Sequence, residues 1–488
     1  MDVCSLLSLI CFGLSCCFVV LPCSIPIPCI VVNDKTVKIL LDYRSSGMIS
    51  ICILLLMGCI DIQQIYDGIV GTETLQPYSI LLLFLSLAYM SISLDQTGIF
   101  SFIAYFFVRR IGNSGKHFYL FIFLLSSILT IFTSNDIVIM TLTPVICYIA
   151  SQSKANVTSY LIIQFFSANI WSAALYIGNP TNVIVAESVG LNFIQYSEWT
   201  LFPTIIAGIT MVLFTACFTY HIIPKEMNID YNTLHGNDLQ KYQAFFGSVI
   251  MFSSIICIII VTFIPHIPVF LAALPFACIV FIKDVFFDVK NYYLHTYQDL
   301  VDNSIELHDV NEELVNNPSS YIKYSWKTKE SIDKMPWNII PFALGMFILV
   351  ESLDKNGWIS NFAELLTFII GDSIMMTIFL IGILSTLFCN IMNNQPMTIL
   401  FVRIILNENF LPHNPSLINP SLFAIALGSN FGANFTLIGA LAGILWSDIL
   451  KQHNQHISYF TFALYGIRIM PIVLLSSLFI LYLEYIIV

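Results

Sequence analysis

Four polar residues in a row, Thr133 to Asp136, interrupt one of the most apolar stretches of this chain. The surrounding sequence reads IFTSNDIVIMTLTP, residues 131–144, so hydroxyl, amide and carboxylate groups stand together among aliphatic side chains. Ser134 and Asn135 can coordinate an ion or an oxyanion, and the carboxylate of Asp136 can bind a cation or carry a proton. Ser134 or Asp136 could instead only cap a helix that starts here. We expect a binding site combined with such a cap.

The composition of the whole chain explains why this cluster is unusual. Hydrophobic residues make up 57% of the 488 residues, charged residues make up 10%, and the mean hydropathy is +0.84. These values lie outside the range of soluble domains. Apolar runs of roughly 18 to 20 residues, the length that spans a bilayer, recur along the chain. Because backbone groups inside a membrane must be hydrogen-bonded within their own segment, the sequence predicts an all-α polytopic membrane protein.

Internal repeats divide the chain into two halves. The segment SLDQTGIFS at 93–101 recurs as SLDKNGWIS at 352–360, and YIGNPTN at 176–182 aligns with LIGALAG at 437–443 at nearly the same offset. Self-similarity in a constant order predicts a duplicated architecture. We predict an N-terminal repeat at 1–224, a linker at 225–244 and a C-terminal repeat at 245–488.

Each repeat is expected to hold about five spanning helices, one re-entrant hairpin and one broken helix. An odd number of crossings inverts the second repeat relative to the first. The first apolar run lacks a basic segment before it, so we interpret it as a retained helix and not as a signal peptide. In the first half, the expected spanning helices lie near 5–24, 46–61, 76–92, 157–189 and 201–222, and the expected hairpins of the two halves lie at 118–150 and about 374–408.

The distribution of basic residues gives the orientation. Under this topology, sixteen of the nineteen lysines and arginines fall on one side, which should be the cytoplasm. Both termini are then non-cytoplasmic, and the segment 284–334 becomes an acidic cytoplasmic loop. The net charge of −11 argues against nucleic acid as a partner. We expect a multi-pass protein of the plasma membrane or of an intracellular membrane.

The hairpin tips and the helix breaks supply the candidate site. Pro180 lacks a backbone donor, so the helix should unwind around Gly178–Asn182 and leave carbonyls and amides facing the hairpin tips. A Na⁺ ion could bind at Asn135, Asp136 and Asn179. The predicted substrate- or ion-binding residues are Thr133, Ser134, Asn135, Asp136, Gly178, Asn179, Thr181, Asn182, Asn393, Asn394, Gln395, Asn430, Asn434 and Thr436.

Other ionisable and sulfur-containing residues are weaker candidates. The thirteen cysteines fall mainly in apolar runs without metal-ligand spacing, so we interpret them as small buried hydrophobic residues. Asp95 and Asp354 occupy equivalent positions of the repeat, where helix capping is the better explanation. Glu351 is a secondary candidate for proton coupling. No resident metal, other cofactor or catalytic residue is predicted.

Several segments together resemble the ion transporter superfamily, which includes arsenite efflux permeases, sodium/proton antiporters and sodium-coupled carboxylate symporters. FTSNDIVIMTLTP, IGNPTNVIVAE and GSNFGANFTLIGALAGILW are most similar to the arsenite permease-like branch. The resemblance implies an elevator-type carrier, commonly a homodimer, in contact with the lipid bilayer. Some arsenite permeases work with an ATPase. Because this chain has no ATP-binding motif, such a subunit would be a separate chain.

Two departures from the carboxylate symporters bear on the substrate. Asp136 stands where they carry Thr, and the second tip reads Met392–Asn393–Asn394, with no Lys or Arg near either tip. A fixed carboxylate suits a neutral oxyacid better than a dicarboxylate, unless cations bind beside it. The sequence therefore favours secondary active transport of a small inorganic solute, an inorganic anion or a neutral oxyacid, with arsenite- or antimonite-type efflux coupled to H⁺ or Na⁺. The alternatives are a sodium/proton antiporter or carboxylate symporter of the same superfamily and, from another class, an ion channel.

Overall fold

The computed structural model describes residues 2–32, 35–71, 76–100, 114–153, 157–219, 223–225, 239–264, 267–306, 326–412 and 414–487, with scattered positions between 101 and 113. In this part of the chain, eight helices are long and apolar enough to cross a membrane. The predicted class, an all-α polytopic membrane protein, is confirmed.

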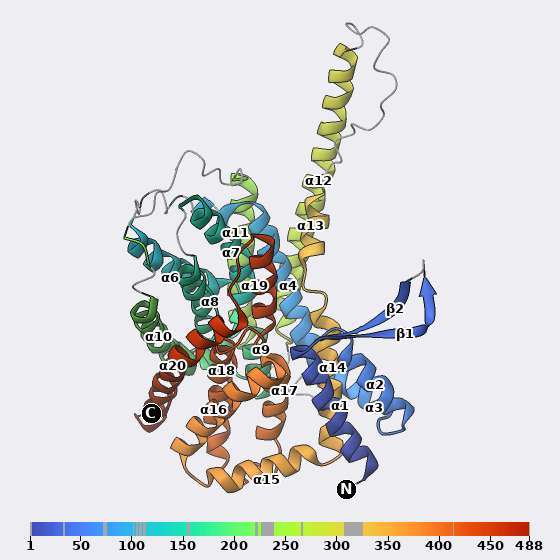
Figure 1. Cartoon of the computed structure of the whole chain (residues 1–488), viewed down its shortest axis with the longest axis vertical. Helices are drawn as coiled ribbons and strands as arrows, with labels where there is room; N and C mark the ends of the chain where they lie inside the picture. The colour runs from blue at the N-terminus through green and yellow to red at the C-terminus, as the bar shows by residue number, and fades with distance from the viewer. Residues whose placement is uncertain are drawn as a thin grey trace.

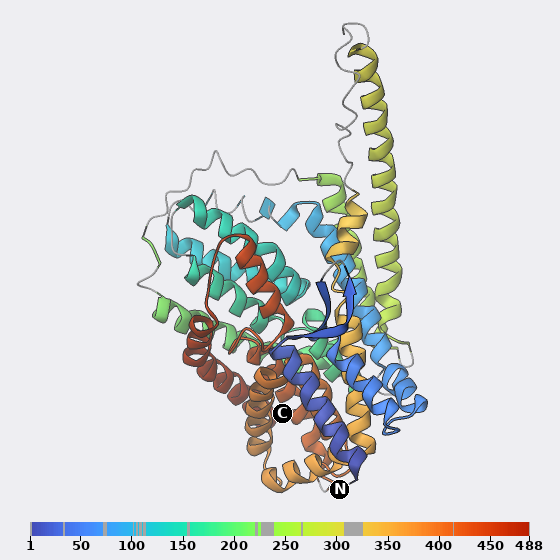
Figure 2. The same cartoon turned by 45° about the vertical axis from the view of Figure 1, so that its right-hand side comes forward.

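One group of helices, which we call the frame, packs along α4 and α14. Helix α12 lies along α4, and α14 lies against α1, α2 and α3. Beyond the packed part, α12 continues as a single helix that projects far from the body (Figures 1 and 2). The frame consists of α1 (Val3–Val20), α2 (Ser46–Leu56), α3 (Ile62–Val70), α4 (Pro77–Gln96), α11 (Lys241–Val261), α12 (Phe270–Glu306), α13 (Lys327–Lys334) and α14 (Ile339–Lys355).

The second group, which we call the hairpin unit, combines helices from both halves of the chain. Its strongest packing joins α16 to α18 and α10 to α20, so segments far apart in sequence share one core. Helix α15 (Trp358–Ile370) runs from the frame to this unit along the lower end in Figure 1. The hairpin unit consists of α6 (Gly115–Phe132), α7 (Asn135–Ser153), α8 (Thr158–Trp171), η1 (Tyr176–Gly178), α9 (Pro180–Ser188), α10 (Phe193–Thr219), α16 (Ile374–Met392), α17 (Asn394–Ile405), η2 (Pro415–Leu417), α18 (Ile418–Gly432), α19 (Leu441–Gln452) and α20 (Tyr459–Ile487).

Helix breaks occur where polar residues interrupt the apolar pattern. Helices α6 and α7 meet at Thr133–Ser134, and α16 and α17 meet at Asn393. Two further helices are interrupted, one between α8 and α9 and the other between α18 and α19. Each predicted hairpin therefore contains two helices joined at its polar tip. Re-entry into the membrane and the inversion of the two repeats stay predictions.

Two sequence expectations need correction. The expected spanning helix at 46–61 is shorter, because α2 ends at Leu56 before Gly58, whose φ of 68° breaks the helix. Much of the expected acidic loop at 284–334 is helical. Helix α12 continues to Glu306, because it contains no Gly or Pro after Pro275, and α13 covers the last eight residues of the expected loop. Residues 307–325, and most of the linker 225–244, lie outside the described residues.

A two-stranded antiparallel hairpin between α1 and α2 was not predicted from the sequence. It is formed by β1 (Cys23–Val32) and β2 (Lys35–Leu41). Its residues continue the apolar pattern of the preceding helix, but they are rich in β-branched side chains, which favour strands. This hairpin is the exception to an otherwise helical architecture in the described part of the chain.

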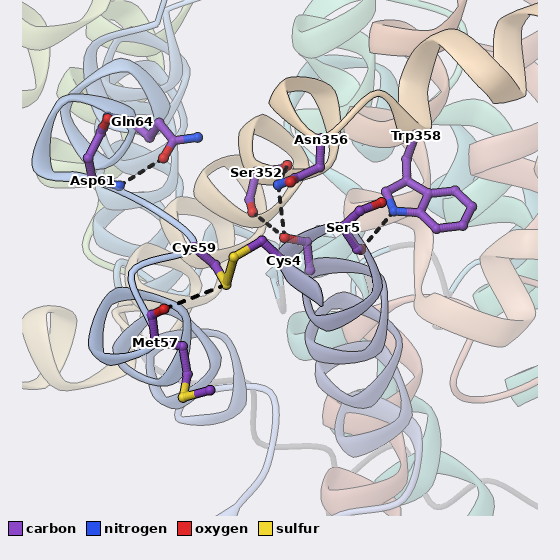
Figure 3. Close-up of a disulfide and its surroundings, with 10 residues drawn as sticks. Cys4, Ser5, Met57, Cys59, Asp61, Gln64, Ser352, Asn356 and Trp358 are labelled. Atoms are coloured by element: carbon purple, nitrogen blue, oxygen red, sulfur yellow. Dashed lines mark hydrogen bonds between the residues drawn. A yellow bond between two sulfur atoms is a disulfide. The ribbon is translucent and has the colours of Figure 1, made fainter. Parts of the chain in front are cut away.

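A disulfide between Cys4 and Cys59 overturns the interpretation of these two residues as isolated apolar side chains. They lie 55 positions apart, but the packing of α1 beside α2 brings their Cα atoms to 5.0 Å, within the range that a disulfide bridges. Figure 3 shows the bond at the start of α1, where the Trp358 indole N–H also donates to the Ser5 carbonyl over 2.8 Å. The sequence spacing alone carried no signal for this pairing.

Candidate functional site

The tip of the first hairpin carries polar atoms without protein partners. Asn135 donates from Nδ2 to Asn169 Oδ1 over 2.9 Å, but its Oδ1 accepts no hydrogen bond from the described residues. The buried Ser134 hydroxyl also lacks a partner there. Thr133 differs, because its hydroxyl donates to the Leu129 carbonyl of its own helix over 2.8 Å. An orphaned buried polar group is costly, so this tip has the character of a binding site.

The second hairpin tip is, by contrast, tied to the neighbouring break of α18–α19. Asn393 donates to the Ile438 carbonyl over 3.2 Å, and the Asn394 N–H donates to the Gly439 carbonyl over 3.0 Å. Thr436 donates to Asn390 Oδ1 over 2.5 Å. The predicted residue Gln395 is buried beside them at the start of α17. These bonds anchor the second tip, so the two hairpins are chemically unequal.

The break between α8 and α9 follows from its residue types. Pro180 begins α9, and Asn179 caps that helix by accepting the Thr181 N–H over 3.2 Å. A Cβ at Gly178 would lie 2.3 Å from the Ser172 carbonyl oxygen, so the tight turn has room only for glycine. The prediction that the helix is interrupted here is confirmed.

Amide side chains connect this break to α18 of the other half. Asn430 Oδ1 accepts Asn179 Nδ2 over 2.9 Å and the Ser172 hydroxyl over 2.7 Å. Its Nδ2 donates to Asn182 Oδ1 over 2.8 Å. All four side chains are buried. The amides therefore hold the two broken helices together.

A second chain of amides continues this network to the first hairpin. Asn169 receives the bond from Asn135 and donates to Asn434 Oδ1 over 2.9 Å. Nearby, the Ser429 hydroxyl donates to Thr181 Oγ1 over 3.2 Å. The first tip is thus linked to helices of both repeats through buried amides. Asn169, Ser172 and Ser429 were absent from the predicted site, although the repeat aligns Asn169 with Asn430, a signal that could have added Asn169.

A cavity of about 230 Å³ lies between the frame and the hairpin unit, and it reaches Ser134 and Asp136. Apolar side chains of α4 and α19 form much of its wall, and Asp333 and Lys334 of α13 are exposed where the cavity meets the surface. Lys334 is already paired with Glu330 over 2.8 Å. The other lining residues are Tyr43, Phe84, Ala88, Ile92, Ile137, Met140, Met335, Pro336, Asn338, Ile339, Leu441, Ile444 and Leu445.

The structure thus separates the predicted site residues into three groups. Ser134 and Asp136 face the cavity, with Asn135 directly between them in the sequence. Buried hydrogen bonds join Asn179, Thr181, Asn182 and Asn430 around the turn at Gly178, and Asn434 is joined through Asn169 to Asn135. Asn393, Asn394, Gln395 and Thr436 belong to the second tip. No cluster of three or more His, Cys, Asp or Glu side chains suited to a metal occurs among the described residues. The suggested Na⁺ site stays a prediction.

Two other predictions concerned helix ends. Asp95 and Asp354 lie inside the last turns of α4 and α14, and α15 starts at Gly357 without a side-chain cap. Capping of α15 by Asp354 is therefore wrong, because Gly357 makes the turn by its left-handed backbone, φ 77°.

Two packed helical units, interrupted helices and a cavity between the units together define a polytopic membrane transporter. The sequence model of the citrate transporter family matches residues 36–416, so the chain belongs to that family. An uncharacterized transporter of Synechocystis sp. is 24% identical over 437 residues, with 84% of this chain and 87% of the relative covered.

Relatives named for arsenical transport are similar at the same level. A putative arsenical pump membrane protein of Bacillus subtilis is 23% identical, covering 80% of this chain and 84% of its own. The arsenical pump membrane protein of Escherichia coli is 23% identical, with 77% and 79% covered. The resemblance to the ion transporter superfamily is confirmed, and the protein is a secondary transporter of this group.

The fold has a solved counterpart. The YdaH transporter of Alcanivorax borkumensis, described as having an unusual topology, superposes with a TM-score of 0.55 at 11% identity. The superposition covers 99% of this chain and 98% of that one. At this identity the likeness concerns the fold alone.

Proposed function

We propose that this transporter moves a small neutral oxyacid, of the arsenous or antimonous acid kind, by alternating access at the cavity beside Asp136. The observation that carries this proposal is the polar chemistry at the first hairpin tip. Asp136 and Asn135 Oδ1 are hydrogen-bond acceptors, and Ser134 can donate or accept. A neutral acid with several hydroxyl groups donates to such acceptors without bringing a second negative charge.

The charges around the cavity support this choice of substrate. Among its described lining residues, the one basic side chain is Lys334, which is paired with Glu330 at the exposed end. A citrate-type anion would meet the Asp136 carboxylate in a mainly apolar pocket without a basic partner, and would have to bring a cation with it. A cation alone suits the same acceptors. Sodium/proton exchange is therefore the second candidate.

Asp136 is proposed as the coupling group. A carboxylate placed deep in a membrane protein costs several kcal/mol on insertion scales, about 2.5 to 3.5 at the bilayer centre, so a role in capping alone would be met by Ser or Asn at lower cost. Competition between a proton and a cation for this one carboxylate would link substrate movement to an ion gradient. No catalytic reaction is assigned to the protein.

Two independent features support an orientation with both termini on the non-cytoplasmic side. The basic residues favour the opposite side for α12, α13 and the connections near them. The Cys4–Cys59 disulfide lies at the start of α1, and disulfides persist in oxidising compartments, whereas cytosolic thiols are kept reduced. In this orientation, the exposed end of the cavity at Asp333 faces the cytoplasm, as efflux requires of a substrate-accepting state.

Transport by purified protein in sealed vesicles tests the substrate class. Arsenite, antimonite, sodium, lithium and dicarboxylates would be offered separately, under an imposed pH or sodium gradient. We expect saturable, gradient-dependent flux of arsenite and antimonite. Flux of dicarboxylates alone would refute the proposal, flux of sodium or lithium alone would favour the exchanger, and flux that does not saturate would favour a channel.

A further inference from the structure

One ion pair crosses from the frame to the hairpin unit. Arg403 of α17 donates to Glu351 of α14 over 2.6 Å. Of the six ion pairs in the described part of the chain, none of the other five joins the two units. Any movement of the hairpin unit along the frame must therefore break or stretch this contact.

The pair is more buried than a surface ion pair. The side chains of Arg403 and Glu351 are 19% and 21% exposed, whereas those of Lys355 and Asp61, another pair at the same end of α14, are 56% and 59% exposed. Partly buried charges are screened less by water and salt, so the contact is stronger than a solvent-exposed one. Ionisable residues inside membrane segments are also functional candidates by default.

Additional acidic groups surround Arg403 on the frame side. Asp354, one turn beyond Glu351 on α14, interacts electrostatically with both Arg403 and Glu351. Asp67 of α3 and Lys355 also act on Glu351. Arg403 thus faces a net acidic patch of the frame. Its loss would leave these carboxylates without their main counter-charge.

The pair and the cavity lie at opposite ends of the same interface. Ile339 at the start of α14 lines the cavity, and Glu351 follows twelve residues later, which corresponds to roughly 18 Å along a helix. On α17, Arg403 lies nine residues after Asn394, the first residue of the helix, and so near its end. The interface is therefore open beside Asp136 at one end and tied by charges at the other.

We propose that Arg403 and Glu351 form a latch that closes the far end of the interface and holds the transporter in the state whose cavity opens beside α13. The inference rests on the alternating access proposed above. Because a carrier must never be open at both ends, contacts at the closed end have to separate when the open end closes. The latch supplies such a contact, and its strength sets the balance between the two states.

The test measures cavity access without any substrate. Met140, which lines the cavity, is replaced by cysteine, and a membrane-impermeant thiol reagent is applied from the side on which α13 lies. The signal is the labelling rate above that of the parent protein. Arg403→Gln should lower this rate by roughly tenfold, since it breaks a partly buried ion pair and shifts the population away from the open state. Glu351→Gln should lower it less, because Asp354 still attracts Arg403.

Matched variants separate a latch from general damage. Asp61→Asn breaks the exposed pair with Lys355 at the same end but within the frame, so it should leave the labelling rate unchanged. The exchanged pair, Glu351→Arg with Arg403→Glu, should restore labelling toward the parent rate. If the single variants fold poorly, a short thiol cross-linker joining Glu351→Cys to Arg403→Cys should arrest transport and keep Met140→Cys reactive.

Three results would overturn the latch: unchanged labelling in Arg403→Gln, an equal loss in Asp61→Asn, or full transport by the cross-linked protein. A different result identifies failure of alternating access itself. If Met140→Cys in the cross-linked protein, which cannot change state, reacts from both sides of the membrane, the cavity is open at both ends, and the proposed alternating access fails together with the latch.

Discussion

Replacing Asn430 by alanine should destabilise the protein through loss of the central amide of the network. Asn430 is fully buried, and it joins α18 to the break between α8 and α9. Without it, Asn179 Nδ2 and Asn182 Oδ1 each lose a hydrogen bond in a site from which water is excluded. The Ser172 hydroxyl is spared, because it also donates to the Asn169 carbonyl over 2.8 Å.

The expected cost follows from those two orphaned groups. A buried donor or acceptor left unsatisfied costs about 1 to 3 kcal/mol, so the free energy of unfolding should fall by about 2 to 6 kcal/mol. Removal of the side-chain volume adds to this loss. Asn409→Ala is a suitable control, since Asn409 donates to Glu364 over 3.1 Å in an exposed position. That change should cost less than about 1 kcal/mol.

Unfolding of the purified protein in detergent, followed by tryptophan fluorescence during heating and in a denaturant series, measures the difference. Asn430→Ala should have a clearly lower midpoint than both the parent and Asn409→Ala. Equal midpoints for all three proteins would refute the reasoning. The amides would then serve mainly to bind substrate, and the same variant should show weaker substrate affinity at unchanged stability.

Three further predictions address the backbone, the disulfide and the surface. Gly178→Ala should impair folding, because its Cβ would lie 2.3 Å from a backbone carbonyl oxygen, whereas Gly13→Ala, with open space at Cβ, should have little effect on expression or on the elution profile in gel filtration. Cys4 and Cys59 should react with a thiol reagent only after a reducing agent is added. Cys4→Ser should lower the free energy of unfolding by up to about 4 kcal/mol, because the disulfide closes a long loop. Labelling of both thiols in intact cells without a reducing agent would contradict the proposed orientation. The backbone N–H of Gln64, and secondarily Lys355, lower the pKa of Asp61 below its ordinary value of 3.8. The Asp61 carboxylate therefore adds to the free energy of unfolding above about pH 3.8, and this stabilisation is lost as the pH falls through the lowered pKa. Asp61→Asn should make stability depend less steeply on pH in this acid range.

Local chemistry made parts of this architecture predictable. Pro180 and Gly178 together interrupt the helix at this position, because Pro180 lacks a backbone donor and Gly178 occupies a turn too tight for a Cβ. Polar residues at Ser134 and Asn393 marked the two hairpin tips in the same way. Such signals depend on neighbouring residues only, so the sequence carries them directly.

Contacts between distant segments were harder to predict. The pairing of Cys4 with Cys59, the bond from Asn169 to Asn434 and the approach of Asp333 to the Asp136 cavity all depend on how helices pack. A repeat indicates which residues are equivalent, but it does not indicate which of them touch. The length of α12 was missed for another reason. Its acidic end was interpreted as a loop, although no Gly or Pro follows Pro275 in this helix.

Gradient-driven uptake of arsenite by reconstituted Asp136→Asn protein tests the central claim most directly. The amide keeps the size and the capping ability of the carboxylate but removes its charge, so the variant should insert and fold like the parent. We predict that it loses the ability to concentrate arsenite when a pH or sodium gradient is imposed, while the parent protein retains that ability. Concentrative uptake by Asp136→Asn equal to that of the parent would contradict the account, because Asp136 would then be a helix cap and not the coupling group.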